Sequence, residues 1–413
     1  MKIKRIHQVH LNITLSNRKA IDMENKLTFI QANILLEHDI LQDGFLTIEN
    51  GKITCIGKMT EYISSPGEKV IDLHHESFLS PGFIDVHIHG ANGADTMDAT
   101  PEAITTMASA LPKEGTTSFL ATTITQSPEN IEKAIRNVAE YRKKHNIPGK
   151  AEVLGIHLEG PFINEKHNGA QPKKYILKPS IDQFQKWQVL ADNAIKLVTL
   201  APEIENASEL ISYLADHDVI ASIGHTDASY EEVVKAAEAG ASHVTHLFNA
   251  MKGMHHREPG TAGAALLLDQ LTAELIADGV HVRPEMIDLA VRMKGEEKIV
   301  LITDSMRAKC LKNGRYDLGG QDVIVRDGKA VLEDGTLAGS ILKMKDSIQN
   351  IIRFTKLSLF QAVRLASTNP AKELKVFDRK GSLAVGKDAD IVVFNPQYEV
   401  QMTLCRGEIA YEQ

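Results

Sequence analysis

Several short apolar runs of this sequence end in side chains that bind metal ions. One run ends in a His-x-His pair, His87 and His89, another ends at Glu159, and two later runs are followed by His225 or contain His246. Imidazole and carboxylate groups are the ligands that a borderline divalent cation such as zinc accepts. Because side chains alternate along a strand, both rings of the pair point to the same side. The residues therefore predict a divalent metal site.

A further carboxylate, Asp304, ends the last of these runs, in the segment ITDSM. A bound divalent ion lowers the pKa of a coordinated water towards neutrality and makes hydroxide available. A carboxylate beside that water can accept its proton and later pass the proton to a leaving amine. Taken alone, Asp304 fits a helix N-cap equally well. Together with the ligands, it predicts metal-dependent hydrolysis with Asp304 as the acid/base.

These side chains need a fold that brings distant segments of the chain together. Between residues 81 and 360, eight apolar runs alternate with stretches of helical spacing, which predicts an α/β fold with a closed, TIM-like (β/α)8 barrel. The C-terminal ends of barrel strands converge on one mouth, where active sites lie. The predicted strands cover residues 82–87, 117–122, 153–158, 196–200, 219–223, 243–247, 273–277 and 298–303.

The two ends of the chain differ from the middle, because they have short strands and close turns. Residues 43–57, DGFLTIENGKITCIG, predict a hairpin that turns at Asn50-Gly51. The C-terminal segment has a similar texture. Both ends are therefore expected to build one small β-sandwich domain.

The predicted domain boundaries follow from this division. Residues 27–80 and 375–413 form the small domain, and residues 81–374 form the metal-dependent catalytic barrel. Residues 1–26 lack the continuous apolar segment of a signal peptide and are expected to be an accessory leader, with Met23 as a candidate natural start.

Composition excludes several classes of protein. The chain of 413 residues has a net charge of −8, which argues against a nucleic-acid partner, since phosphate backbones require clustered basic residues. No apolar run approaches the roughly 18 residues of a membrane span. The three cysteines are far apart and form neither a disulfide framework nor a CxxC pair. The expectation is a cytoplasmic protein with no membrane or nucleic-acid partner.

Several motifs resemble one known family. The His-x-His pair, the aspartate of strand eight and the small flanking domain resemble the amidohydrolase superfamily. Within it, HLEGPF, GHTDA, THLFNAM, REPG, ADGVH, TDSM and LAGS resemble the N-acetylglucosamine-6-phosphate deacetylase family in order and spacing, over about residues 27–410. The resemblance implies hydrolysis of N-acetyl-D-glucosamine 6-phosphate to D-glucosamine 6-phosphate and acetate, in amino-sugar catabolism and cell-wall sugar recycling.

The resemblance also implies the metal ligands. Glu159, His225 and His246 match the principal ligands of the family. Some members replace the His-x-His pair and hold one ion, whereas others keep it, so a second ion at His87 and His89 is left open. Strand four, in IKLVTLAPE, has no lysine at its C-terminal end to bridge two ions, so Glu159 would be the bridge. The expected ion is Zn²⁺, with Fe²⁺, Mn²⁺ or Co²⁺ as alternatives.

The remaining matches concern catalysis and the substrate. Asp304 matches the family's acid/base, and His281 matches a histidine that contacts the substrate and polarises its carbonyl group. Arg257 matches a phosphate-contacting arginine that reaches across from the partner subunit in relatives, which implies a homodimer. Some members carry a histidine where Gln171 stands here. The implied substrate contacts are Ala170, Gln171, Asn249, Ala250, Arg257, Asp278, Gly279, Val280, His281, Leu337, Ala338 and Gly339.

Two other functions compete with this one. A cyclic amidohydrolase or deaminase of the same superfamily would need a ring-binding pocket, and the HLFNAM and REPG segments argue against it. A catalytically inactive sugar-phosphate binding protein would be expected to have lost ligands or Asp304, and all are present. Without the resemblance, HHREPG would indicate an ordinary basic loop. The loop residue His167 could also approach the site.

Overall fold

Eight parallel strands form the sheet at the centre of the structure. The computed structural model describes residues 26–413, so the predicted leader lies outside the described residues except for Lys26. The strands pair in the order β15-β14-β13-β12-β11-β10-β9-β6, which confirms the predicted barrel. They are β6 (Phe83–Ile88), β9 (Thr116–Thr123), β10 (Glu152–Glu159), β11 (Ile195–Leu200), β12 (Ile220–Ile223), β13 (His243–Val244), β14 (Thr272–Ile276) and β15 (Ile299–Ile302).

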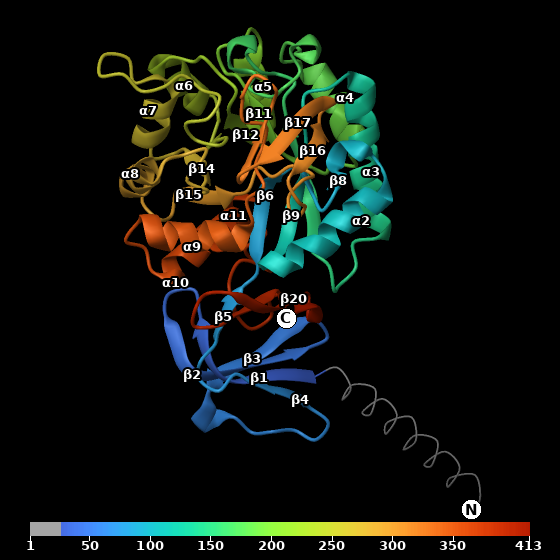
Figure 1. Ribbon diagram of the computed structural model, residues 1–413, viewed down its shortest axis with the longest axis vertical. Coiled ribbons are helices and arrows are strands. Elements are labelled where there is room, and N and C mark those ends of the chain that lie inside the picture. The colour runs from blue at the N-terminus through green and yellow to red at the C-terminus, as the bar shows by residue number, and fades with distance from the viewer. Residues whose placement is uncertain (1–25) are drawn as a thin grey trace, which may run out of the picture.

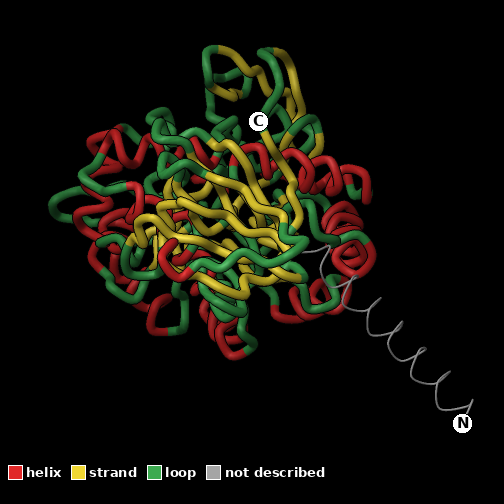
Figure 2. The backbone as a smooth tube through the Cα atoms, turned by 90° about the horizontal axis from the view of Figure 1, so that it is seen from below, coloured by secondary structure: helices red, strands yellow, loops and turns green. Residues whose placement is uncertain are grey.

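Helices cover the outside of this barrel (Figures 1 and 2). In α3, the hydroxyl of Ser127 accepts a hydrogen bond from the backbone of Asn130, and the helix buries Ile131, Ile135 and Val138 at helical spacing. The helices are α2 (Pro101–Ala110), α3 (Pro128–Lys144), α4 (Ile181–Leu190), α5 (Ala207–Asp216), α6 (Tyr230–Glu238), α7 (Gly260–Leu267), α8 (Pro284–Lys294), α9 (Met344–Phe354), α10 (Leu359–Ala366) and α11 (Thr368–Glu373). None of the helices in the described part of the chain is long and apolar enough to cross a bilayer.

The barrel interior contains many polar side chains. The Nε2 atom of His157 lies 2.7 Å from the hydroxyl of Thr199, which lies 2.7 Å from that of Thr245, and Ser222 lies 2.6 Å from the same Thr245 hydroxyl. All four side chains are buried, so these hydrogen bonds replace the lost contacts with water. These four side chains therefore form a polar, hydrogen-bonded layer inside the barrel, beneath the mouth.

Both chain ends contribute to a second sheet of eight strands, which lies at the opposite end of the barrel from the mouth (Figure 1). Its order is β21-β20-β19-β5-β1-β2-β3, with β4 paired to β1. The predicted hairpin is confirmed, since β2 and β3 pair antiparallel around Asn50-Gly51. The strands are β1 (Lys26–Leu35), β2 (Ile40–Glu49), β3 (Lys52–Lys58), β4 (Lys69–Asp72), β5 (Phe78–Pro81), β19 (Ile391–Phe394), β20 (Val400–Cys405) and β21 (Glu408–Glu412). We propose that this sheet is the small domain, with boundaries at residues 27–80 and 375–413.

A buried ion network joins the second sheet to the barrel. Arg379 and Lys380 both contact Glu152, at the start of β10, with N···O distances of 2.6 and 2.8 Å. The same two cations contact Asp388, and Lys380 also contacts Asp390. Burial by itself would raise the pKa of Glu152, but the two cations lower it to about 2. Glu152 is therefore held as a carboxylate at the junction.

A small antiparallel sheet, absent from the sequence expectations, covers one side of the mouth. It consists of β16 (Gly314–Leu318), β17 (Gln321–Arg326) and β18 (Lys329–Val331), inserted after the last barrel strand. The Gln321 amide donates to the backbone carbonyl of Ala170, and the Gln126 amide donates to that of Gly319 at 3.1 Å. These contacts attach the insert to the loops of the mouth.

Candidate active site

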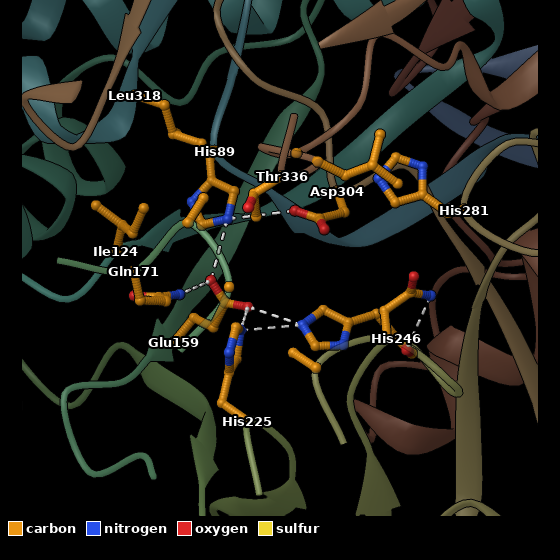
Figure 3. A pocket seen from close by; sticks show the side chains of 16 residues that line it. His89, Ile124, Glu159, Gln171, His225, His246, His281, Asp304, Leu318 and Thr336 are labelled. Atoms are coloured by element: carbon orange, nitrogen blue, oxygen red, sulfur yellow. Dashed lines mark hydrogen bonds and ion pairs between the residues drawn. The ribbon is translucent and has the colours of Figure 1, made fainter. Parts of the chain in front are cut away.

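The predicted ligands lie at the C-terminal ends of the barrel strands, and Figure 3 shows His89, Glu159, His225 and His246 facing one another. His87 lies in β6, with His89 just beyond its end, and Glu159 ends β10. His225 and His246 follow β12 and β13 after short turns. Four of these five side chains line a cavity of about 220 Å³, and His87 lies fully buried beside it. The structure thus brings together every residue that the sequence indicated as a ligand.

Three site residues have a left-handed backbone conformation. The φ angles of His225, His246 and Asp304 are 51°, 30° and 47°. Residues other than glycine rarely adopt positive φ, and such conformations persist where the surrounding structure holds them, often at functional sites. At each of these positions the chain leaves its strand, and the side chain lines the cavity.

Glu159 occupies the centre of the site. Its Oε1 atom lies 3.2 Å from the Nε2 atoms of both His225 and His246. Its Oε2 atom lies 3.2 Å from His89 Nε2 and accepts a hydrogen bond from Gln171 Nε2 at 2.6 Å. Burial would raise the pKa of Glu159, but His87 and the neighbouring histidines lower it well below its usual value. Glu159 is therefore an ionised carboxylate between two pairs of histidines.

Asp304 lies on the other side of the His-x-His pair. Its Oδ1 atom is 3.3 Å from His89 Nε2 and 3.5 Å from His87 Nε2. Burial opposes ionisation, but the two histidines lower the pKa of Asp304. Burial would lower the pKa of His89, but Asp304 and Glu159 raise it to about 10. Anionic and imidazole groups thus stabilise one another across the cavity.

The nitrogen atoms that face the cavity have the chemistry of metal ligands. His225 donates its Nδ1 hydrogen to the backbone carbonyl of His167, at 2.8 Å, so its Nε2 atom carries the lone pair. His87 Nε2 is buried and has no hydrogen-bond partner among residues 26–413. The ligand atoms form two compact groups, each within 4.8 Å, namely Glu159, His225 and His246, and His87, His89 and Asp304. This donor set fits a divalent cation.

In a third compact group, of His87, His157 and Glu274, both ring nitrogens of His157 are already hydrogen-bonded. The carbonyl oxygen of Val86 lies 3.2 Å from His157 Nδ1 and can only accept, so Nδ1 carries the hydrogen. His157 Nε2 therefore accepts a hydrogen bond from the hydroxyl of Thr199. Burial, with the nearby charge of His87, lowers the pKa of His157 to about 3, so the ring is neutral. This group supports the site from below and does not extend it.

The predicted substrate residues divide into four sets. Asp278 does not line the cavity but accepts from His281 Nδ1 at 2.6 Å, which holds the His281 ring at the edge of the cavity. Arg257 is exposed, does not line the cavity, and contacts His256 at 2.6 Å. Gly279, Val280 and Ala338 adjoin the site without lining it. The predicted residues that line the cavity are Ala170, Gln171, Asn249, Ala250, His281, Leu337 and Gly339.

Four residues that the sequence had not indicated also line the cavity, namely Ile124, Gly169, Leu318 and Thr336. Ile124 follows the second predicted strand, so its place at a strand end could have indicated it. Leu318 and Thr336 belong to the inserted sheet and the loop after it, and neither carried a chemical signal.

Comparisons with known proteins agree with this geometry. The model of the amidohydrolase family matches residues 78–410. An N-acetylglucosamine-6-phosphate deacetylase of Bacillus subtilis is 50% identical over 391 residues, which cover 94% of this chain and 98% of that protein.

Solved structures give the same result. The crystal structure of N-acetylglucosamine-6-phosphate deacetylase from Pasteurella multocida has a TM-score of 0.87 at 30% identity, covering 93% of this chain and 99% of that chain. A mutant of the Mycobacterium smegmatis deacetylase, in complex with N-acetyl-D-glucosamine 6-phosphate, has a TM-score of 0.85 at 30% identity, covering 93% and 98%. By sequence, fold and the matched segment, the chain belongs to the amidohydrolase family.

Proposed function

We propose that the chain removes the acetyl group from N-acetyl-D-glucosamine 6-phosphate, releasing acetate and D-glucosamine 6-phosphate in amino-sugar catabolism and the recycling of cell-wall sugars. The observation that carries this proposal is the position of Asp304, whose Oδ1 atom lies 3.3 Å from His89 within a set of metal-ligand side chains. The relatives named above act on this substrate by their names, and one was solved with it.

Glu159, His225 and His246 would hold the principal divalent ion, for which we propose Zn²⁺, with Fe²⁺, Mn²⁺ or Co²⁺ as alternatives. His87 and His89 would hold a second ion, and Glu159 would serve both groups, which is supported by its two oxygens facing different histidines. Such an ion, when bound, polarises a carbonyl oxygen and lowers the pKa of a coordinated water.

Asp304 is proposed to move the protons of the reaction. Its lowered pKa keeps it a carboxylate, so it can accept a proton from the attacking water as the oxygen bonds to the acetyl carbon. When the carbon–nitrogen bond breaks, the same proton passes from Asp304 to the amine nitrogen. The products are then acetate and the free amine.

His281 is proposed to orient the acetamide. Burial would lower its pKa, but the hydrogen bond and charge of Asp278 raise it, which favours a ring that donates from its other nitrogen to a carbonyl oxygen. Gln171, Asn249, Ala250 and the segment from Leu337 to Gly339 are proposed to contact the sugar. All of these except Ala338 line the cavity.

Arg257 is proposed to bind the phosphate in the site of a partner subunit of a homodimer. It is exposed and does not line the cavity of its own chain. Beside it, Met254, Leu267 and Met293 are 52%, 54% and 47% exposed and line an apolar groove between α7 and α8. An arginine next to exposed apolar side chains suits an interface in which the arginine reaches a phosphate bidentately.

We also propose a cytoplasmic location, since Cys55, Cys310 and Cys405 are all free thiols. The function is tested by stripping the protein of metal, restoring Zn²⁺, and measuring amine and acetate release. Release of both products from N-acetyl-D-glucosamine 6-phosphate in equal amounts, only after metal is restored, supports the proposal. Hydrolysis of cyclic amides in preference to this substrate would support the competing function instead.

A further inference from the structure

Glu274 is a fully buried carboxylate inside the barrel, on the strand β14. It lies in an otherwise apolar run, and a buried carboxylate is costly unless it is paired and hydrogen-bonded. The two carboxylate oxygens of Glu274 face two histidines, with Oε2 2.9 Å from His87 Nδ1 and Oε1 3.4 Å from His243 Nε2. Its place in the barrel therefore calls for an explanation beyond packing.

One oxygen of Glu274 contacts two strands that carry predicted ligands. Oε2 accepts a hydrogen bond from His87 Nδ1 at 2.9 Å and another from the backbone N–H of His246 at 3.1 Å. The first bond places a hydrogen on Nδ1 and turns the opposite nitrogen, Nε2, towards Glu159 and Asp304, at 3.4 and 3.5 Å. The second bond fixes the turn that presents His246.

We propose that Glu274 is a positioning residue of the metal site, which holds the His87 ring in its ligand orientation and ties it to the backbone of His246. The inference rests on the proposed function in one respect, namely that His87 and His246 are metal ligands. Ligating histidines generally donate their second nitrogen to a carboxylate or carbonyl group, and such partners contribute strongly to metal affinity.

Glu274 is itself held from the side away from the mouth. Its Oε1 atom lies 3.4 Å from His243 Nε2, and His243 Nδ1 lies 3.3 Å from Glu373 Oε2. The other Glu373 oxygen accepts from the hydroxyl of Thr272 at 2.9 Å. This column of side chains, buried except for the partly exposed Glu373, runs from α11 through the barrel to His87, so the carboxylate of Glu274 has neighbours on both sides.

His157 provides a contrast within the same layer. Its ring packs edge-on against that of His87, with 4.4 Å between the centroids, but its hydrogen bonds go to Val86 and Thr199. His157 therefore restricts the His87 ring by contact alone. Of the described side chains, only that of Glu274 makes a hydrogen bond with His87 Nδ1.

The test measures metal binding and needs no activity assay. We expect Glu274→Leu to weaken binding of the His87-dependent ion by about 10–100-fold, the usual loss when the partner of a ligating histidine is removed. Glu274→Gln keeps an oxygen that can accept from His87 and should restore part of the affinity. The matched control is Glu373→Gln, which alters the same column without touching His87 and should change affinity less than threefold. Equilibrium dialysis against Co²⁺, with elemental analysis and the visible absorption of bound Co²⁺, gives the affinities.

A double-mutant cycle with His87→Ala separates positioning from a general loss of structure. If Glu274 acts through His87, removing Glu274 from the His87→Ala variant lowers the metal affinity little further. The losses of affinity from the two changes then do not add. Equal losses in both backgrounds would overturn the inference and leave the ligand assignment intact. If His87→Ala itself leaves Co²⁺ binding unchanged, the ligand role of His87 fails, and the inference fails with it. Should Glu274→Leu not fold, as judged by circular dichroism, the same cycle is run with Glu274→Gln.

Discussion

Asp304 donates its backbone N–H to the backbone carbonyl of His87 at 2.8 Å, where the end of the last barrel strand meets the first. A bridge between Ile88 and Ser305 continues this contact. The closure of the barrel thus sets the carboxylate of Asp304 against His87 and His89. Asp304, which follows the last barrel strand, and the pair His87 and His89, at the end of the first strand, share a site because these two strands meet where the barrel closes.

Asp304→Asn is expected to leave folding and metal content nearly intact and to reduce turnover by about 100-fold or more. Loss of a general acid/base usually costs about 10²–10⁴-fold, and here both proton steps depend on one group. The measurement is steady-state deacetylation, with circular dichroism and elemental analysis as controls. More than a tenth of the wild-type activity in this variant would show that Asp304 is not the acid/base.

The two ligand groups should differ in their effect on metal content. His225→Ala or His246→Ala is expected to release the principal ion, since each removes a nitrogen that faces Glu159 Oε1 at 3.2 Å. The combined change His87→Ala/His89→Ala should leave at least one ion bound. Elemental analysis measures the metal content of each variant. If the single variants and the double variant all lose their metal completely, His87 and His89 belong to the principal site.

Arg257→Ala is expected to lower kcat/KM for the phosphorylated substrate by about 100-fold. A bidentate arginine–phosphate contact is a charge-assisted pair that is worth a few kcal/mol where water is largely excluded. Unphosphorylated N-acetylglucosamine lacks that contact, so its slow turnover should barely change. Small, equal effects on both substrates would indicate a solvent-exposed loop arginine.

Subunit mixing tests whether Arg257 acts across a dimer. Arg257→Ala protein and Asp304→Asn protein are each expected to be nearly inactive, but a mixed dimer would contain one site with both residues intact. Mixing should therefore restore part of the activity on the phosphorylated substrate. Failure to complement, once subunit exchange has been demonstrated, would place Arg257 outside the partner's site.

The buried ion network at Glu152 predicts a pH dependence of stability. Its pKa is lowered to about 2 from an ordinary 4.5 in the folded chain, so its stabilisation is present above about pH 4.5 and is lost as the pH falls from there towards 2. Glu152→Gln should lower the free energy of unfolding by about 3 kcal/mol at pH 7, and the difference from wild type should shrink at low pH. Urea denaturation between pH 7 and pH 3 measures both.

A matched control for this prediction is Glu140→Gln, which removes an exposed ion pair with Lys144 on α3. Exposed pairs contribute little to stability, so this variant should behave like the wild type at every pH. A Glu152→Gln variant that is as stable as the Glu140→Gln variant at pH 7 would contradict the role given to the network.

The sequence by itself determined the barrel and the candidate ligands. Apolar runs of strand length that alternate with segments of helical spacing are local patterns of the sequence. A chain with eight such runs has few ways to bury all of the strands that they form. Glu159, His225 and Asp304 stood at the ends of these runs, so the geometry of any parallel barrel brings them to one mouth. The hairpin at Asn50-Gly51 was equally local, because the turn residues specify it.

Only the tertiary structure decided how the ligands are supported. The hydrogen bonds from His225 to the carbonyl of His167 and from His87 to Glu274 join residues 58 and 187 positions apart, and no local pattern specifies such partners. The insert that brings Leu318 to the cavity likewise carries no signal of chemistry, since its contacts are apolar packing and hydrogen bonds between glutamine amides and backbone carbonyls. Residue type reveals a ligand, whereas the partner that orients it is fixed only when the chain folds.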